Sequence, residues 1–139
     1  MNYKLIDLPL RGDQRGNLVF AQQGDHIPFA VQRIFYIYDV PQGAVRAGHA
    51  HRAQHQCLIM LSGSCRVAIE DGIDRSSVVL NSPRIALYAP PLVWLDIDEF
   101  SAGAMCLVLT SGLYDEADYV RERAEFVRLT ANRGRSSPD

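Results

Sequence analysis

The 139-residue sequence predicts an all-β protein, either a sandwich or a barrel, that ends in one short helix. Short runs rich in β-branched and aromatic residues follow one another along most of the chain. Turn signals such as Asp71–Gly72 separate these runs, and no helical periodicity lies between them. The length suits a single domain, which we place at residues 1–131.

The predicted strands alternate in the way that a half-buried sheet requires. The clearest example is residues 31–40. One face of this run carries Val31, Arg33, Phe35 and Ile37, and the other carries Gln32, Ile34, Tyr36 and Tyr38. Further strands are expected at residues 57–61, 65–70, 73–80, 85–89, 93–97 and 104–110.

The helical segment is expected to begin at Asp115, an N-cap residue followed by Glu116 and Asp118 in the first turn. A narrow apolar stripe at helical spacing consists of Ala117, Val120, Ala124 and Val127. Arg121 is expected to face solvent. The tail, residues 132–139, is rich in Gly, Ser and Pro, and we expect it to be disordered.

The composition excludes several classes of function. Hydrophobic residues make up 47% and charged residues 22%, as in ordinary soluble globular proteins. The net charge of -2 argues against nucleic-acid binding, and no apolar run could span a bilayer, so neither partner is expected. The N-terminus lacks the apolar core of a signal peptide, which favours the cytoplasm. Cys57, Cys65 and Cys106 lie in apolar runs and are expected to be buried free thiols.

Residues 46–56 hold three of the four histidines and form the densest cluster of reactive side chains. If residues 48–52 form a strand, His49 and His51 point to the same face, with Cβ atoms roughly 6 to 7 Å apart. An ordinary histidine pKa near 6.5 suits proton transfer at neutral pH. The alternative is a pair of surface histidines on an edge strand.

A metal site is a second interpretation of this cluster. Three imidazoles, from His49, His51 and His55, could bind iron or zinc. The spacing of these histidines resembles the first motif of metal-binding cupins, and that resemblance implies a further histidine from a later strand, where Trp94–Leu95 offers no ligand. His26 lies far upstream in a turn. We therefore expect no metal.

Arginines form a second group, because Arg15, Arg33 and Arg46 lie in or beside strand-like segments, where a charge needs a partner. The partner is either an anionic ligand such as a diphosphate, which arginine binds with a planar fork, or one of the carboxylates. Those carboxylates are Asp13, Asp39 and Asp96. Tyr36 could hold a proton on a ligand oxygen or could simply pack.

Several stretches resemble the dTDP-4-keto-6-deoxyglucose 3,4-ketoisomerases, a cupin family of deoxyamino-sugar biosynthesis. They are R15-G-N-L18, R33-I-F-Y-I-Y-D39, G48-H-A-H51, L61-S-G-S-C-R-V67 and Y114-D-E-A-D-Y119, and the resemblance covers about residues 3–130. It implies a cupin jelly-roll barrel without metal or other cofactor. It also implies a thymidine-diphosphate-linked keto-sugar as substrate, and a homodimer that exchanges N-terminal strands.

By position, the resemblance places His49 and His51 on the active-site pair of the family, and Arg15, Arg46 and Tyr36 on residues that line the same pocket. Gln56 falls on a polar residue after the histidine strand. The expected reaction moves the ketone from C4 to C3 through an enediol, with His51 as the base and His49 as a hydrogen-bonding or relay group. Arg46 and Arg15 would hold the diphosphate or a sugar oxygen, and Tyr36 would orient the sugar.

Leu95 departs from the polar or basic residue that the family often carries, so the resemblance does not predict the C4 configuration of the product.

Three alternatives stay open at this point. A sugar-nucleotide 3,5-epimerase would use a His–Asp dyad, and no aspartate stands out as the partner. A metal-dependent cupin enzyme would need stoichiometric metal. A non-catalytic cupin that binds a sugar nucleotide would accommodate the apolar Leu95.

Overall fold

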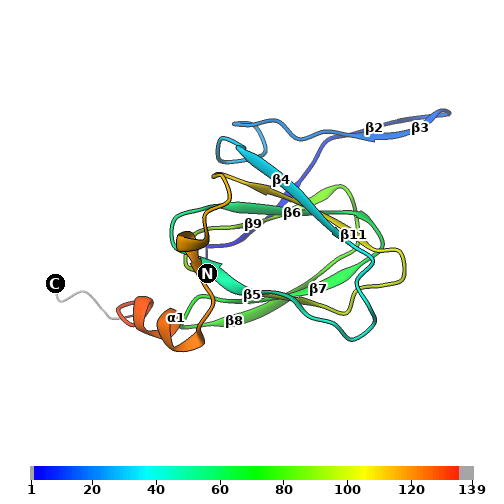
Figure 1. Ribbon diagram of the computed structural model, residues 1–139. Coiled ribbons are helices and arrows are strands. Elements are labelled where there is room, and N and C mark those ends of the chain that lie inside the picture. Colours follow the sequence, from blue (N-terminus) through cyan, green and yellow to red (C-terminus); the bar gives the residue numbers. More distant parts are fainter. Residues whose placement is uncertain (1, 135–139) are drawn as a thin grey trace.

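The computed structural model describes residues 2–134, which form two five-stranded sheets that face each other, as in a jelly roll (Figure 1). The first sheet has the order β1-β9-β6-β11-β4 and the second the order β12-β5-β10-β7-β8. The predicted class, mostly strands with one short C-terminal α-helix, is confirmed.

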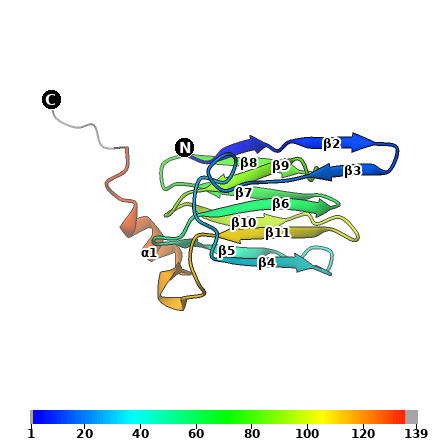
Figure 2. The ribbon, with the colours of Figure 1, turned by 90° about the horizontal axis from the view of Figure 1, so that it is seen from above.

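The first sheet contains β1 (Lys4–Asp7), β9 (Ile85–Ala89), β6 (Gln56–Ser62), β11 (Met105–Thr110) and β4 (Arg33–Tyr38). The second contains β12 (Tyr119–Val120), β5 (Arg46–His51), β10 (Trp94–Asp98), β7 (Cys65–Glu70) and β8 (Arg75–Leu80). A separate hairpin pairs β2 (Leu10–Asp13) with β3 (Gly16–Val19), and it extends away from the two sheets (Figures 1 and 2).

The core lies between the sheets and follows the period-two pattern of the sequence. Alternate side chains of β4 are exposed, with Ile34, Tyr36 and Tyr38 more than half accessible, whereas Phe35 and Ile37 pack against the core. The fully buried members of the core come from both sheets and include Leu58, Met60, Val67, Ile69, Leu87 and Val108. The predicted faces of residues 33–38 are therefore confirmed.

The C-terminal segment differs from the single helix that the sequence predicts. Asp115 caps only a 3-10 turn, η1 (Glu116–Asp118), by accepting a hydrogen bond from the Ala117 amide. The chain then forms β12, which pairs with β5, before α1 (Arg123–Leu129) begins. A continuous helix would form its backbone hydrogen bonds internally and leave the edge of β5 unpaired. Pairing β12 with β5 satisfies the backbone groups of that edge, so the tertiary contact overrides the local helical pattern.

The expected apolar stripe of this segment was wrong for the same reason. Val120 is buried, but Ala117, Ala124 and Val127 are exposed. The residue that anchors α1 is Phe126, which is buried and stacks on Trp94 with ring centroids 5.6 Å apart.

The cysteine prediction is confirmed, because Cys57, Cys65 and Cys106 are buried free thiols. Burial raises the pKa of Cys57 and of Cys106 to about 12, and that of Cys65 to about 11. Such thiols hold their protons at neutral pH and are poor nucleophiles.

Arg133, in the part of the chain expected to be disordered, binds two loops that connect strands. The Arg133 guanidinium donates hydrogen bonds to the backbone carbonyls of Asp71 (2.9 Å) and Leu92 (2.5 Å). Residues 135–139 lie outside the described residues.

Candidate active site

A bulge in β5 determines where the two central histidines point. Ala47 and Gly48 both adopt left-handed backbone conformations, with φ of 69° and 72°, and the register against β10 shifts between Leu95 and Asp96. A bulge of this kind twists a strand and redirects the side chains that follow it. His49 comes directly after the bulge and pairs across the sheet with Leu95.

His49 and His51 lie side by side, as the period of a strand predicts. Their ring centroids are 5.1 Å apart and the rings are perpendicular. Tyr119 of β12, which pairs with His51 in the register, packs against both rings at 4.8 Å and 4.4 Å. The two imidazoles and the phenol therefore form one cluster on the inner face of the second sheet.

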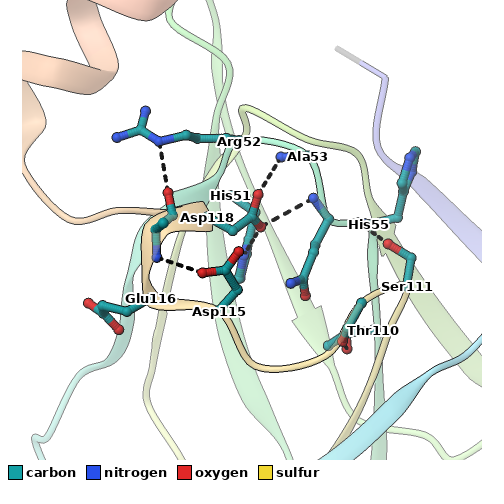
Figure 3. A network of polar contacts seen from close by, with 12 residues as sticks. His51, Arg52, Ala53, His55, Thr110, Ser111, Asp115, Glu116 and Asp118 are labelled. Carbon is teal, nitrogen blue, oxygen red and sulfur yellow. Dashed lines mark hydrogen bonds and ion pairs between the residues drawn. The ribbon is translucent and has the colours of Figure 1, made fainter.

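A buried carboxylate holds His51. The Nδ1 atom of His51 lies 2.9 Å from Oδ2 of Asp118, and both side chains are less than one-tenth exposed. Asp118 also accepts hydrogen bonds from the backbone amides of Ala53 (2.8 Å) and Gln54 (3.3 Å) (Figure 3). Because a carboxylate only accepts, the Nδ1 atom of His51 carries the hydrogen, and its Nε2 atom has a free lone pair in the neutral ring.

His49 has a backbone partner instead. Its Nδ1 atom lies 3.1 Å from the carbonyl oxygen of Ala47, which the bulge brings into reach. Burial, together with the neighbouring His51, lowers the pKa of His49 to about 4. Burial also lowers the pKa of His51, against the opposing effect of Asp118. Both rings are therefore neutral near pH 7, the state in which an imidazole accepts a proton.

A cavity of about 310 Å³ opens beside this cluster. His49 and Tyr119 line it, whereas His51 packs against both rings and is only 4% exposed. Apolar side chains, which include Phe35, Leu58, Leu95 and Val108, make up much of the wall. The polar groups are few: Gln56, Arg46 and Arg121 lie at the lining together with the two rings. Such a mixture is typical of a small-molecule site.

The structure brings some of the predicted site residues together and leaves others apart. His49, Arg46 and Gln56 line the cavity. Arg33 does not line it, and its guanidinium donates to Thr110 Oγ1 (3.2 Å) and Gln54 Oε1 (3.3 Å).

Tyr36 and Arg15 lie outside the cavity of their own chain. The expectation that Tyr36 faces the histidines does not hold within one chain, because odd-numbered residues of β4 point inward and Tyr36 is 58% exposed on the other face. Arg15 lies in the turn of the β2–β3 hairpin, where its almost fully exposed guanidinium pairs with Asp13.

Three residues of the site were not predicted from the sequence: Asp118, Tyr119 and Arg121. No aspartate stands out in the sequence as a partner of the histidines, but in the structure Asp118 bonds His51. The signal lies in the stretch Y114-D-E-A-D-Y119, which supports the family resemblance but whose local pattern predicts the start of a helix. In a helix Arg121 would face solvent, whereas in the strand-like segment it reaches the cavity.

His55 does not join the pair. It lies beyond the turn that follows β5, pointing away from the Asp118 carboxylate (Figure 3). Its Nδ1 atom is 2.7 Å from the hydroxyl of Tyr88, and the two rings stack. The three-imidazole metal site is therefore not assembled, and residues 2–134 contain no group of three His, Cys, Asp or Glu side chains suited to a metal ion.

Within the part of the chain that the structure describes, no helix has both the length and the apolar character to cross a membrane.

Comparison with known proteins identifies the family. Residues 1–131 match the family described as FdtA: WxcM-like, C-terminal. The chain is 38% identical over 131 residues to the TDP-4-oxo-6-deoxy-alpha-D-glucose-3,4-oxoisomerase of Aneurinibacillus thermoaerophilus, with 94% of each protein covered.

Two solved structures are similar over nearly the whole chain. A 3,4-ketoisomerase from Helicobacter canadensis has a TM-score of 0.91 and 39% identity, and covers 94% of this chain and 98% of that one. A mutant of the 3,4-ketoisomerase QdtA from Thermoanaerobacterium thermosaccharolyticum, in complex with TDP-4-keto-6-deoxyglucose, has a TM-score of 0.93 and 33% identity, with 96% of each chain covered. The chain therefore belongs to the FdtA, WxcM-like family, together with these sugar-nucleotide 3,4-ketoisomerases.

Proposed function

We propose that the protein is an isomerase that converts a dTDP-4-keto-6-deoxyhexose to its 3-keto isomer, in deoxyamino-sugar biosynthesis. The observation that carries the proposal is the paired imidazoles of His49 and His51, 5.1 Å apart beside a cavity, in a chain 38% identical to a named 3,4-oxoisomerase. The cavity volume of about 310 Å³ lies at the lower end of the range for small-molecule sites.

The reaction requires only movements of protons. A base takes the hydrogen from C3, which the C4 ketone acidifies, and the electrons of that bond form the C3–C4 double bond of an enediolate. The C4 oxygen gains a proton. A proton then adds to C4 while the C3 hydroxyl loses its own, which leaves the ketone at C3 and a hydroxyl at C4. Substrate and product are isomers, so no oxidant is consumed.

His51 is the base in this proposal. Its Nε2 lone pair is free because Nδ1 donates to Asp118, and the carboxylate stabilises the imidazolium that forms when the ring takes a proton. Asp118 acts through His51 and is therefore a positioning residue.

His49 is the neutral relay. It lines the cavity and has no carboxylate partner, and its pKa of about 4 keeps the ring uncharged at neutral pH. Its Nε2 atom is free to hydrogen-bond the edge of the sugar that carries O3 and O4, because Nδ1 donates to Ala47. Gln56 and Arg46 add polar contacts at the same cavity.

A homodimer that exchanges part of the N-terminal region would account for Arg15. Strand β1 pairs with β9 of its own chain, so the part available for exchange is the β2–β3 hairpin, which extends from the sheets with Leu18 58% exposed. In such a dimer Arg15 would reach the cavity of the second copy, and Tyr36, on the outer face of edge strand β4, would pack in the interface. A sedimentation experiment that finds a monomer at working concentrations would reject this arrangement.

The function is tested by incubating the purified protein with dTDP-4-keto-6-deoxyglucose in D₂O and following the sugar by NMR. The expected result is a 3-keto sugar with deuterium at C4, and the coupling constants of the product give its C4 configuration. Deuterium at C3 and C5 with the ketone still at C4 would indicate a 3,5-epimerase. Saturable binding with neither exchange nor product would indicate a binding protein. Activity that a chelator abolishes and one metal restores would indicate a metal-dependent enzyme.

A further inference from the structure

The edge of the cavity carries a cation that the sequence did not assign to it. Of the arginines in residues 2–134, Arg46 and Arg121 line the cavity. The guanidinium of Arg33 is engaged by Thr110 and Gln54, and Arg15 is in the distant hairpin. Any anionic part of a ligand in the cavity of this chain therefore meets Arg46 or Arg121.

Neighbouring side chains fix the orientation of Arg121. Its Nε atom donates to Oε1 of Glu116 (2.6 Å) and its Nη2 atom to Oε2 (3.1 Å). The Tyr114 hydroxyl donates to the same carboxylate (2.6 Å), and the guanidinium lies 4.3 Å above the ring of Tyr119. Two of the five N–H groups of the guanidinium are used in this way, so three stay free for a ligand.

We infer that Arg121, held by Glu116 and Tyr119, binds the diphosphate of the nucleotide-sugar. The inference rests on the proposed function and assigns one of its binding residues. The Tyr119 ring that supports the guanidinium also contacts His49 and His51. Since the diphosphate is attached to C1 of the sugar, it lies within one sugar ring of the carbons that react. A cation separated from the histidines by one phenol ring is in the right place to hold it.

Arg123, two residues further on, provides a matched control. It also pairs with a glutamate, Glu70 (2.7 Å), and also lies over an aromatic ring, 4.9 Å from the centroid of Trp94. It does not line the cavity. The two arginines therefore make the same kinds of contact within the protein and differ in their access to a ligand.

The test is titration calorimetry of the full chain with TDP and with thymidine, for the wild type, Arg121→Met and Arg123→Met. A guanidinium–phosphate bond is charge-assisted, so Arg121→Met should weaken TDP binding by at least about 10-fold. Thymidine has no phosphate, and its affinity should change by less than about 3-fold, since only packing is altered. Arg123→Met should change neither affinity.

Arg121→Lys keeps the positive charge and loses the planar fork, so its TDP affinity should fall between those of the wild type and Arg121→Met. If Arg121→Met does not fold, the TDP affinity of Arg121→Lys tests whether Arg121 binds the diphosphate. Wild-type affinity for TDP in the Arg121 variants, or an equal loss for TDP and thymidine in them, would overturn the assignment. A wild-type protein that binds no TDP would overturn the proposed function, and this inference with it.

Discussion

Strand β5 and the turn that follows it, residues 52–55, each carry histidine, yet only the strand contributes to the cluster at the cavity, where His49 lines the wall and His51 packs against it. His49 and His51 follow a bulge, stand side by side and have free Nε2 atoms. His55, four residues after His51, stacks on Tyr88 and does not line the cavity. The difference teaches that backbone geometry, rather than nearness in sequence, selects which histidines can share a ligand.

His51→Asn is expected to give the largest difference in kcat between a substitution in β5 and one in the turn of residues 52–55. Removing the base should lower kcat by at least about 10²-fold, while the affinity for TDP changes little. His55→Asn is the control and should leave kcat within about 3-fold, because this ring stacks on Tyr88 and is not part of the His49–His51 cluster. Steady-state kinetics on dTDP-4-keto-6-deoxyglucose gives both values. Near-normal turnover in the His51 variant would reject its role as the base.

Asp118→Asn tests a second difference between the two regions. Of His49, His51 and His55, only His51 is hydrogen-bonded to a carboxylate, that of Asp118. We expect kcat to fall by at least about 10-fold, since an amide cannot stabilise the imidazolium as a carboxylate does. Asp118 raises the pKa of His51, so its loss should also move the acid limb of the kcat profile to lower pH. Damage to packing alone would lower the rate without moving the limb. Asp115→Asn, which keeps a capping side chain, should change neither.

Gly48→Ala tests whether the bulge matters in itself. Gly48 has φ of 72°, and a residue with a Cβ atom in this region costs about 1 to 2 kcal/mol of folding stability. Gly103 has φ of 74° in the turn before β11, with open space for a Cβ atom, so Gly103→Ala should lose a similar amount. Only Gly48→Ala should also lower kcat, by about 3- to 10-fold, because it displaces His49. Equal activity in the two variants would show that the bulge has no role in catalysis.

The smallest expected effect is a dependence of folding stability on pH that comes from the lowered pKa of His49. The pKa of His49 is about 4 in the folded protein and near 6.5 when the chain is unfolded. As the pH falls from 6.5 to 4, the unfolded chain takes up a proton first, so folding stability is lost, by about 1 to 2 kcal/mol for a partly exposed ring. Urea unfolding at pH 7 and pH 5 should show a smaller loss for His49→Gln than for the wild type. An equal loss in both would contradict the lowered pKa.

The sequence could predict the features that follow from local periodicity. Alternation gave the faces of β4, and the period of two placed His49 and His51 together. It could not predict Asp118, because the bond to His51 joins residues 67 positions apart and depends on β12 pairing with β5. The helix-like pattern of residues 115–128 concealed that short strand.

The site positions that the family resemblance implies differ in where the structure places them relative to the cavity. Arg46 and Gln56 lie on strands that enclose the cavity, and both side chains line it. Arg15 and Tyr36 lie on the hairpin and on an outward face, and one chain alone does not bring them to the histidines. In the dimer proposed above, their role would depend on a second copy, which the local sequence pattern does not describe.

The central claim is that the His49–His51 pair, with His51 as the base, moves the hydrogen of C3. The most direct test follows the C3 proton of dTDP-4-keto-6-deoxyglucose by NMR in D₂O, with the wild type and with His51→Asn that binds TDP normally. The account predicts that the wild type removes the C3 signal as the 3-keto sugar appears, whereas the variant leaves it in place. Loss of that signal at the wild-type rate in the variant would contradict the account.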